Sequence, residues 1–192
     1  MQISFKAKIP ISTCNIYNKS TNKFERATIY EIDCKDEEDL SYLSNPDGMW
    51  EFKTSITYDA RSKYYESLLH LNQDSQDKYY SLEAQDGTIA CMCETQPFFK
   101  DTNIKYIESN PNKRYKYAGQ TMLASIAKKI IDTSQNLTIH IPSFEARDFY
   151  SKVCAFNEDT TGFGYELSQK DMKNFIQRTE KRTCGEIINY HS

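Results

Sequence analysis

The sequence predicts an α/β fold of the α+β kind, in which one domain holds strands and helices in a mixed order. Two observations predict it. Residues 104–131 have the pattern of a strand, a basic turn and a helix whose apolar residues recur at i and i+4. Two alternating stretches, 78–84 and 88–94, flank an Asp-Gly pair that strongly favours a tight hairpin. The 192 residues can bury a core of ordinary size, and no linker or repeat marks a boundary between domains.

The first part of the chain is expected to contribute strands and helices. Residues 2–9 alternate loosely and predict an extra strand, followed by a polar stretch to about residue 23. Residues 24–33 alternate well and predict a strand. The acidic residues 36–39 are typical of a first helical turn, where the helix dipole favours negative charge. Apolar residues at three- and four-residue steps then predict a long amphipathic helix over 49–71.

The hairpin and the strand-turn-helix segment form the middle of the chain. Ile104, Tyr106 and Ile107 begin an apolar strand. Pro111 ends that strand, because proline has no backbone donor. The core helix is expected to follow Gly119.

Shorter elements are predicted for the last third. A strand over 137–141 is closed by Pro142, a short helix spans about 144–153, and another strand lies near 163–167. Residues 169–182 are predicted to form the last helix, with a polar tail behind it.

Composition excludes several classes of protein. The 24 basic and 27 acidic residues are near balance, unlike the basic excess of genome-binding proteins, and no apolar run has the length of a membrane span. Neither a nucleic acid nor a membrane is therefore a predicted partner. The 6 cysteines show no C-x-x-C spacing, which favours reduced thiols in a cytoplasmic protein. Cys91 and Cys93 are expected on one face of a strand. The 3 histidines lie far apart, so no metal site is predicted.

The basic turn before the core helix is the main candidate for a binding site. Lys113, Arg114 and Lys116 precede Ala118-Gly119, where the helix is expected to begin. The free amides and the dipole of a helix N-terminus attract phosphate groups, and a cationic loop strengthens that attraction. The alternative is a solvated basic turn before an ordinary core helix.

Three segments of residues 26–168 resemble the GNAT-type N-acetyltransferases. Residues 111–119 resemble the family's acyl-CoA loop, a Gln or Arg followed by two residues, Gly, one residue, and Gly or Ala, with Arg114 in the first place and Gly119 in the last. Residues 143–152 resemble the family's Asn-x-x-Ala-x-x-Phe-Tyr-x-Lys helix. The hairpin lies where the family has its central hairpin.

This resemblance implies a mixed, mostly antiparallel central sheet flanked by helices, with the acyl-CoA loop between the fourth strand and the core helix. It implies a single domain with an N-terminal extension (1–23), a core (24–168) and a C-terminal helix and tail (169–192).

The resemblance also implies acetyl-CoA as co-substrate. Backbone amides after Arg114 would hold the pyrophosphate, with Lys116 as a further cation, and the pantetheine would add to the strand near 107–109 like another strand. The implied binding residues are Ile107, Ser109, Arg114, Tyr115, Lys116, Tyr117, Ala118, Gly119, Gln120, Ser143 and Lys152.

Tyr150 and Glu108 are the candidate catalytic residues. By resemblance, Tyr150 gives a proton to the leaving thiolate; an ordinary phenol has a pKa near ~10 and a thiol near ~8.5. The alternative is a core tyrosine on an amphipathic helix. An ordinary amine acceptor is almost fully protonated at pH 7, so a base is also expected. Glu108 is the nearest carboxylate in the central strand, while Glu83 and His140 are open alternatives.

The predicted activity is acetyl transfer from acetyl-CoA to an amine of a small molecule or a protein. Two departures from the family pattern favour an alternative, a binding or regulatory protein that keeps the fold without the transfer. Tyr117 stands where the family's loop has its middle glycine, which a tyrosine can replace if its φ is negative, and Ser143 replaces an asparagine. The acidic residues 36–39 would suit a cationic acceptor, and a homodimer is a candidate assembly.

Overall fold

The computed structural model describes residues 8–32, 76–110, 114–140 and 142–190. The helical pattern predicted over 49–71, the acidic residues 36–39 and Pro111 lie outside the described residues.

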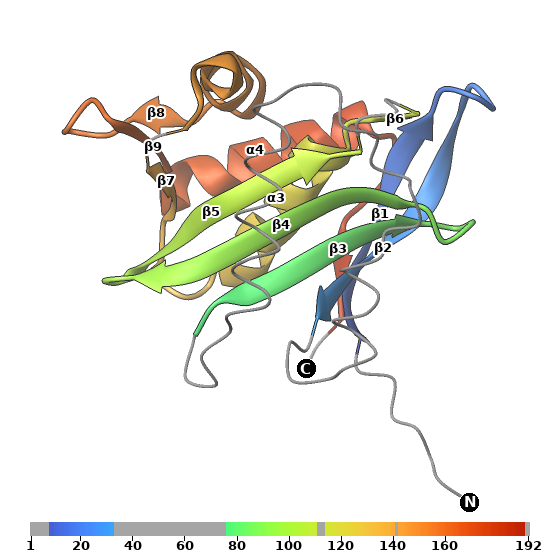
Figure 1. Ribbon diagram of the computed structural model, residues 1–192, viewed down its shortest axis with the longest axis horizontal. Coiled ribbons are helices and arrows are strands. Elements are labelled where there is room, and N and C mark those ends of the chain that lie inside the picture. The colour runs from blue at the N-terminus through green and yellow to red at the C-terminus, as the bar shows by residue number, and fades with distance from the viewer. Residues whose placement is uncertain (1–7, 33–75, 111–113, 141, 191–192) are drawn as a thin grey trace, which may run out of the picture.

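One sheet of ten strands forms the centre of the molecule (Figure 1). Its order is β10-β1-β2-β3-β4-β5-β7-β9-β8, with β6 paired to β1. Every pairing is antiparallel except that of β5 with β7, which confirms the mixed, mostly antiparallel sheet. The strands are β1 (Lys8–Asn18), β2 (Lys23–Ile32), β3 (Lys78–Ala84), β4 (Ile89–Phe98), β5 (Asp101–Ser109), β6 (Tyr115–Lys116), β7 (Leu137–His140), β8 (Asn157–Glu158), β9 (Gly164–Leu167) and β10 (Ile188–Asn189).

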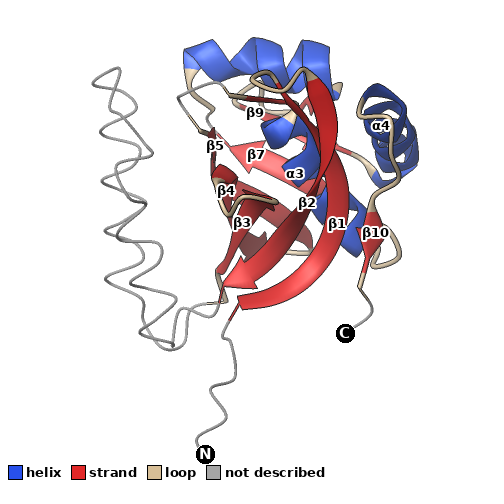
Figure 2. Cartoon of the chain, turned by 90° about the vertical axis from the view of Figure 1, so that its right-hand side faces the viewer, coloured by secondary structure: helices blue, strands red, loops and turns tan. Residues whose placement is uncertain are grey.

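Helices α3 (Ala118–Ile130) and α4 (Gln169–Arg182) lie on the same side of the sheet, side by side in both views (Figures 1 and 2). The apolar side of α3 is buried against the sheet, because Met122, Leu123 and Ile126 join one core cluster with Cys91 and Cys93 of β4. We call the side of the sheet that carries these two cysteines the core face. Their common side, expected from the spacing, is confirmed.

The segment between β7 and β8 forms two short helical turns instead of one helix. They are the 3₁₀ turn η1 (Phe144–Ala146) and the π-helical turn η2 (Phe149–Cys154), where a continuous helix over about 144–153 was expected. The other expected strands and helices within the described residues are present as β2, β3, β4, β5, α3, β7, β9 and α4.

The first strand corrects the expectation for the N-terminal part. Residues 2–7 of the strand predicted over 2–9 lie outside the described residues. Strand β1 runs from Lys8 to Asn18, through the stretch expected to be polar, and pairs with β2 along its length. Ser12 and Asn18 are buried together with Cys14 and Ile16, all spaced two apart. Because half of this inward row is polar, its hydrophobic alternation is weak in the sequence.

The C-terminal tail also differs from expectation. Residues after α4 return to the sheet, where β10 pairs with β1 in the register Ser12↔Asn189 and Thr13↔Ile188. A strand of two residues has too few positions to show a period of two, so it gives no sequence signal.

An opening in the sheet lies between β5 and β7. The two strands pair only at Thr102↔Leu137 and Asn103↔Thr138, whereas β5 continues to Ser109 along β4. Within the described part of the chain, residues 104–109 therefore have no strand partner on the β7 side. This part of β5 ends beside the start of α3.

Candidate active site

The N-terminus of α3 is open to an anion. The Tyr117 side chain makes no capping hydrogen bond, and the first turn contains no acidic residue. The first intrahelical bond that starts here runs from the Thr121 amide to the Tyr117 carbonyl at 2.8 Å. The amides before it have no acceptor within the helix, and the dipole adds partial positive charge at this end. This turn has the electrostatic character of a phosphate-binding site.

Tyr117 has a left-handed backbone, with φ 69°. A tyrosine can replace the loop's glycine without strain only if its φ is negative, and the positive φ of Tyr117 does not meet that condition. The conformation is one that glycine adopts at no cost and that costs other residues about 1–2 kcal/mol. The loop thus has a glycine-like backbone without a glycine.

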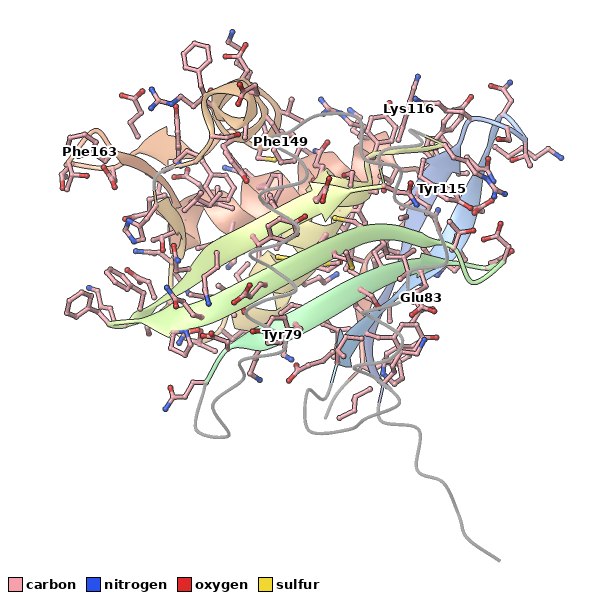
Figure 3. All side chains as sticks on the ribbon, in the orientation of Figure 1. Tyr79, Glu83, Tyr115, Lys116, Phe149 and Phe163 are labelled. Carbon is pink, nitrogen blue, oxygen red and sulfur yellow. The ribbon has the colours of Figure 1, made fainter. Side chains whose placement is uncertain are left out.

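Gly119 brings three elements together. A Cβ at this position would lie 3.0 Å from Ser109 Oγ at the end of β5 and 3.4 Å from the ring of Phe149 in η2. A side chain there would have to displace both neighbours. Glycine therefore allows the first turn of α3 to approach the end of β5 and η2 closely, and Figure 3 shows Phe149 in this region.

The end of β5 divides its side chains between the two faces of the sheet. Ser109 pairs with Cys91 and Ile107 with Cys93, so both lie on the core face. Glu108 pairs with Met92 and lies on the opposite face, where its carboxylate accepts a hydrogen bond from the Tyr106 hydroxyl. The pairing thus gives the face of the sheet on which Glu108 lies, which the sequence alone left open.

The two alternatives to Glu108 lie in different surroundings. Glu83, near the hairpin end of β3 (Figure 3), forms an ion pair of 2.8 Å with Lys8. His140 is exposed at the end of β7, where its ring packs against Phe98 with centroids 4.7 Å apart.

Tyr150 is buried on the core-face side of the opening, with 6% of its surface exposed. Its ring packs against those of Phe149, Phe156 and Tyr165. Burial raises the pKa of its phenol well above the ordinary value, and the nearby thiol of Cys93 adds to this. Tyr150 therefore keeps its proton over the whole neutral range.

Two cations of the basic turn, Arg114 and Lys116, already have neighbours, while Lys113 lies outside the described residues. Arg114 forms an ion pair of 2.9 Å with Asp86 in the β3–β4 turn and lies over the ring of Tyr115. Burial alone would raise the pKa of Asp86, but hydrogen bonds from Thr88 and the charge of Arg114 outweigh it, so this pKa lies below its usual range.

Tyr115 and Lys116 form β6, a short strand paired with β1 (Figures 1 and 3). The Tyr115 hydroxyl lies 3.3 Å from Asp86, and burial raises its pKa to about 12. Lys116 is exposed above the ring of Tyr17. These residues therefore flank the first turn of α3 from the β1 side.

Of the three remaining predicted binding residues, one lies in the first turn of α3 and two lie elsewhere. Gln120 is buried in the first turn, but its side chain is used by α4: it donates to Thr179 at 3.0 Å. Ser143 is exposed before η1, and Lys152 is exposed and paired with Asp148 at 2.8 Å.

Sequence reasoning missed Phe149 as the residue that packs against Gly119. In the sequence it stood out only as the Phe of the Asn-x-x-Ala-x-x-Phe-Tyr-x-Lys motif.

Among the described residues, no group of three or more His, Cys, Asp or Glu side chains is arranged to hold a metal ion. No helix in the described ranges has both the length and the apolar character needed to cross a membrane.

No family model and no curated protein matches this chain. Solved structures do. A protein from Desulfovibrio desulfuricans assigned to the GNAT family of acetyltransferases superimposes with a TM-score of 0.55 and 14% identity, over 74% of this chain and 99% of that one. The PaiA N-acetyltransferase from Thermoplasma acidophilum, solved with coenzyme A, superimposes with a TM-score of 0.50 and 14% identity, over 74% of this chain and 98% of that one.

A chimera of the spermidine N-acetyltransferase SpeG from Vibrio cholerae gives a TM-score of 0.53 with 12% identity, over 77% of this chain and 98% of the chimera. At this identity the likeness speaks to the backbone alone. Together with the strand order and the opening beside α3, it shows that this chain has the fold of the GNAT acetyltransferases.

Proposed function

We propose that this protein is an acetyl-CoA-dependent N-acetyltransferase whose acceptor is an amine of a small molecule or a protein. One observation supports it above the others. The first turn of α3, the end of β5 and the turn that carries Tyr150 meet beside the opening between β5 and β7. An anion-binding turn, an unpaired strand edge and a buried proton donor are what acyl transfer from a phosphorylated thioester carrier requires.

The residues present fit acetyl-CoA, which supplies an activated acetyl thioester when bound. The amides of Ala118, Gly119 and Gln120 would hold its pyrophosphate, because no acidic side chain in the first turn competes for them. The unpaired edge of β5 near 107–109 would hold the pantetheine through main-chain hydrogen bonds, as an added strand does.

Tyr150 would act as the general acid. Its raised pKa keeps the hydroxyl protonated in the resting protein, so a proton is ready for the departing thiolate. Its neighbours are aromatic rings and buried thiols, which exclude water from the place where charge develops.

Glu108 would accept the proton of the amine, directly or through water. The hydrogen bond from Tyr106 orients this carboxylate at the end of β5. Glu83 is the weaker candidate, because its carboxylate is already engaged in an ion pair of 2.8 Å with Lys8.

A second candidate function is a GNAT-fold protein that binds acetyl-CoA, or another phosphorylated ligand, without transfer. The left-handed Tyr117 favours it, since a side chain occupies a place where the motif has only a hydrogen. The ion pair of Arg114 with Asp86 points the same way, because that cation is already neutralised.

The first experiment compares thermal melts with acetyl-CoA, CoA and ATP at millimolar concentration. A ligand at 100 times its dissociation constant adds about 2.7 kcal/mol of stability. In a chain of 192 residues that raises Tm by roughly 5–10 °C. We expect this rise with both CoA species and little with ATP. No rise with either CoA species contradicts the binding site itself.

The second experiment measures release of free thiol from acetyl-CoA with a panel of amines. Tyr150→Phe should retain the thermal shift and lose about 100-fold or more in rate, the size of a lost general acid. Tyr165→Phe removes a hydroxyl from a neighbouring buried tyrosine and should leave the rate unchanged. Binding without thiol release for any amine would favour the second candidate function.

A further inference from the structure

Helix α4 carries three exposed cations at its C-terminal end. They are Arg178, Lys181 and Arg182, and none of the described residues places an acidic group within ion-pair distance of them. The acidic neighbour on the same helix, Glu180, is used elsewhere. It pairs with Lys128 of α3 at 3.0 Å and accepts from the Ile187 amide at 3.0 Å.

A cavity of about 550 Å³ runs along the same side of α4. Arg178 and Lys181 line it towards the C-terminal end of α4, and Ala155, Leu167 and Phe175 contribute apolar surface. Asp171 lines it near the start of α4, where its carboxylate accepts a hydrogen bond of 2.7 Å from the Ser168 hydroxyl. A cavity that combines an apolar wall with unpaired cations suits a ligand with a flat apolar part and a phosphate.

The cationic end of this cavity lies next to the proposed acetyl-CoA site. Arg182 donates to the side-chain oxygen of Gln120, in the first turn of α3, at 3.0 Å. Arg178 donates to the carbonyl of Cys154, at the end of η2, at 3.3 Å. The two guanidinium groups therefore contact α3 and η2, the two elements that flank the proposed acetyl-CoA site.

The electrostatics at this junction favour an anion. Arg182 is held by a neutral amide at the positive end of the α3 dipole, where like charges repel. The negative end of the α4 dipole stabilises Arg182 in the free protein, and a negative group bound between Arg182 and the start of α3 would be attracted by both. Coenzyme A carries a 3′-phosphate on the ribose that bears its pyrophosphate, so a pyrophosphate at the start of α3 brings a second phosphate within reach of one long side chain.

We propose that the cavity beside α4, with Arg178, Lys181 and Arg182, binds the 3′-phosphorylated adenosine end of acetyl-CoA. The proposal rests on the proposed function. It assigns α4 the task of selecting coenzyme A over carriers that lack the 3′-phosphate. A separate 3′-phosphorylated nucleotide has the same chemistry, and the experiment distinguishes the two sources.

The test measures dissociation constants for CoA and 3′-dephospho-CoA by titration calorimetry. We expect the wild type to bind CoA about tenfold more tightly, the size of a charge-assisted contact to one phosphate. In Arg178→Gln/Lys181→Gln, the two affinities should become equal within about twofold, through loss of CoA affinity while dephospho-CoA affinity stays. Lys173→Gln removes a charge from the same helix outside the cavity lining and should keep the preference.

The outcomes separate this proposal from the proposed function. Equal affinity of the wild type for both compounds overturns the role of α4 and leaves the acetyl-CoA site standing. Binding of adenosine 3′,5′-bisphosphate to CoA-saturated protein, abolished in the double variant, overturns the coenzyme as the source and identifies a separate nucleotide site. If neither CoA nor dephospho-CoA binds, the proposed function fails and this proposal fails with it.

Discussion

Tyr117 shows how a single residue can keep a binding loop's shape at a cost in stability. Its φ of 69° is a glycine conformation, and Gly119 two residues later is held close to Ser109 and Phe149. Whether the protein transfers acetyl groups depends on how much space the Tyr117 side chain leaves for a pyrophosphate at the start of α3. The stability of the loop depends only on its backbone, so the two questions can be tested apart.

We predict that Tyr117→Gly raises the free energy of unfolding by about 0.5–1 kcal/mol. Relief of the left-handed strain, worth about 1–2 kcal/mol, exceeds the extra entropy that glycine loses on folding. Denaturant unfolding measures the change. Lys116→Gly, at a neighbour without positive φ, should lower stability, and an equal gain there would show that strain at Tyr117 is not the cause.

Tyr150 and Glu108 show which parts of a site a sequence can predict. The motif around Tyr150 indicates a helical turn with an inward tyrosine, and the structure buries that residue. Its pKa is raised chiefly by burial and further by the thiols of Cys93 and Cys91 of another strand, surroundings that no local pattern reveals. The face of Glu108 follows from a register that a bulge between Glu94 and Thr95 helps to set.

At the scale of elements, the strongly periodic segments were predictable and the irregular ones were not. The α4 helix matches its predicted range of 169–182, because it has an N-cap serine and a regular apolar row. The stretch of β1 after residue 9 was expected to be polar loop, because its inward-facing Ser12 and Asn18 interrupt the apolar alternation. The π-helical η2 has a period unlike that of an α-helix, so its motif predicted a helix of the wrong kind.

The N-caps of α4 and η1 allow a matched test of capping. The Ser168 side chain accepts a hydrogen bond from the Asp171 amide, whereas Ser143 caps η1 without a side-chain bond. We predict that Ser168→Ala lowers the free energy of unfolding by about 1 kcal/mol. Ser143→Ala should change it by less than about 0.3 kcal/mol, since no cap is lost. Equal losses in the two variants would contradict the assignment of the cap.

Across the whole molecule, the N-terminal strand and the C-terminal segment hold each other in place. Asn15 donates to the carbonyl of Cys184, and a Cβ at Gly185 would lie 2.1 Å from the Asn15 amide nitrogen. Lys128 links α3 to Glu180 and to the Ile187 carbonyl. The segment after α4 thus holds that helix beside α3.

A second junction joins the sheet to α3 and makes the stability of the whole fold depend on pH. Glu31 of β2 pairs with Lys78 of β3 at 3.1 Å and with Lys129 of α3. Burial would raise the pKa of Glu31, but the hydrogen bonds and charges of Lys129 and Lys78 outweigh it, so the pKa in the folded protein lies below its usual range.

A carboxyl with a lowered pKa stabilises the fold above its unfolded pKa, near ~4.3, and loses that contribution as the pH falls through the folded value. We predict that Glu31→Gln lowers the free energy of unfolding at pH 7 by about 1 kcal/mol or less, because both lysines are partly exposed and solvent weakens the pairs. The difference from wild type should shrink below pH ~4.3 and vanish below the folded pKa. Urea unfolding from pH 7 to pH 3 measures it, with Glu158→Gln on the exposed edge strand as control. A difference that persists at pH 3 would mean that Glu31 acts through its shape and packing, because its charge is then gone.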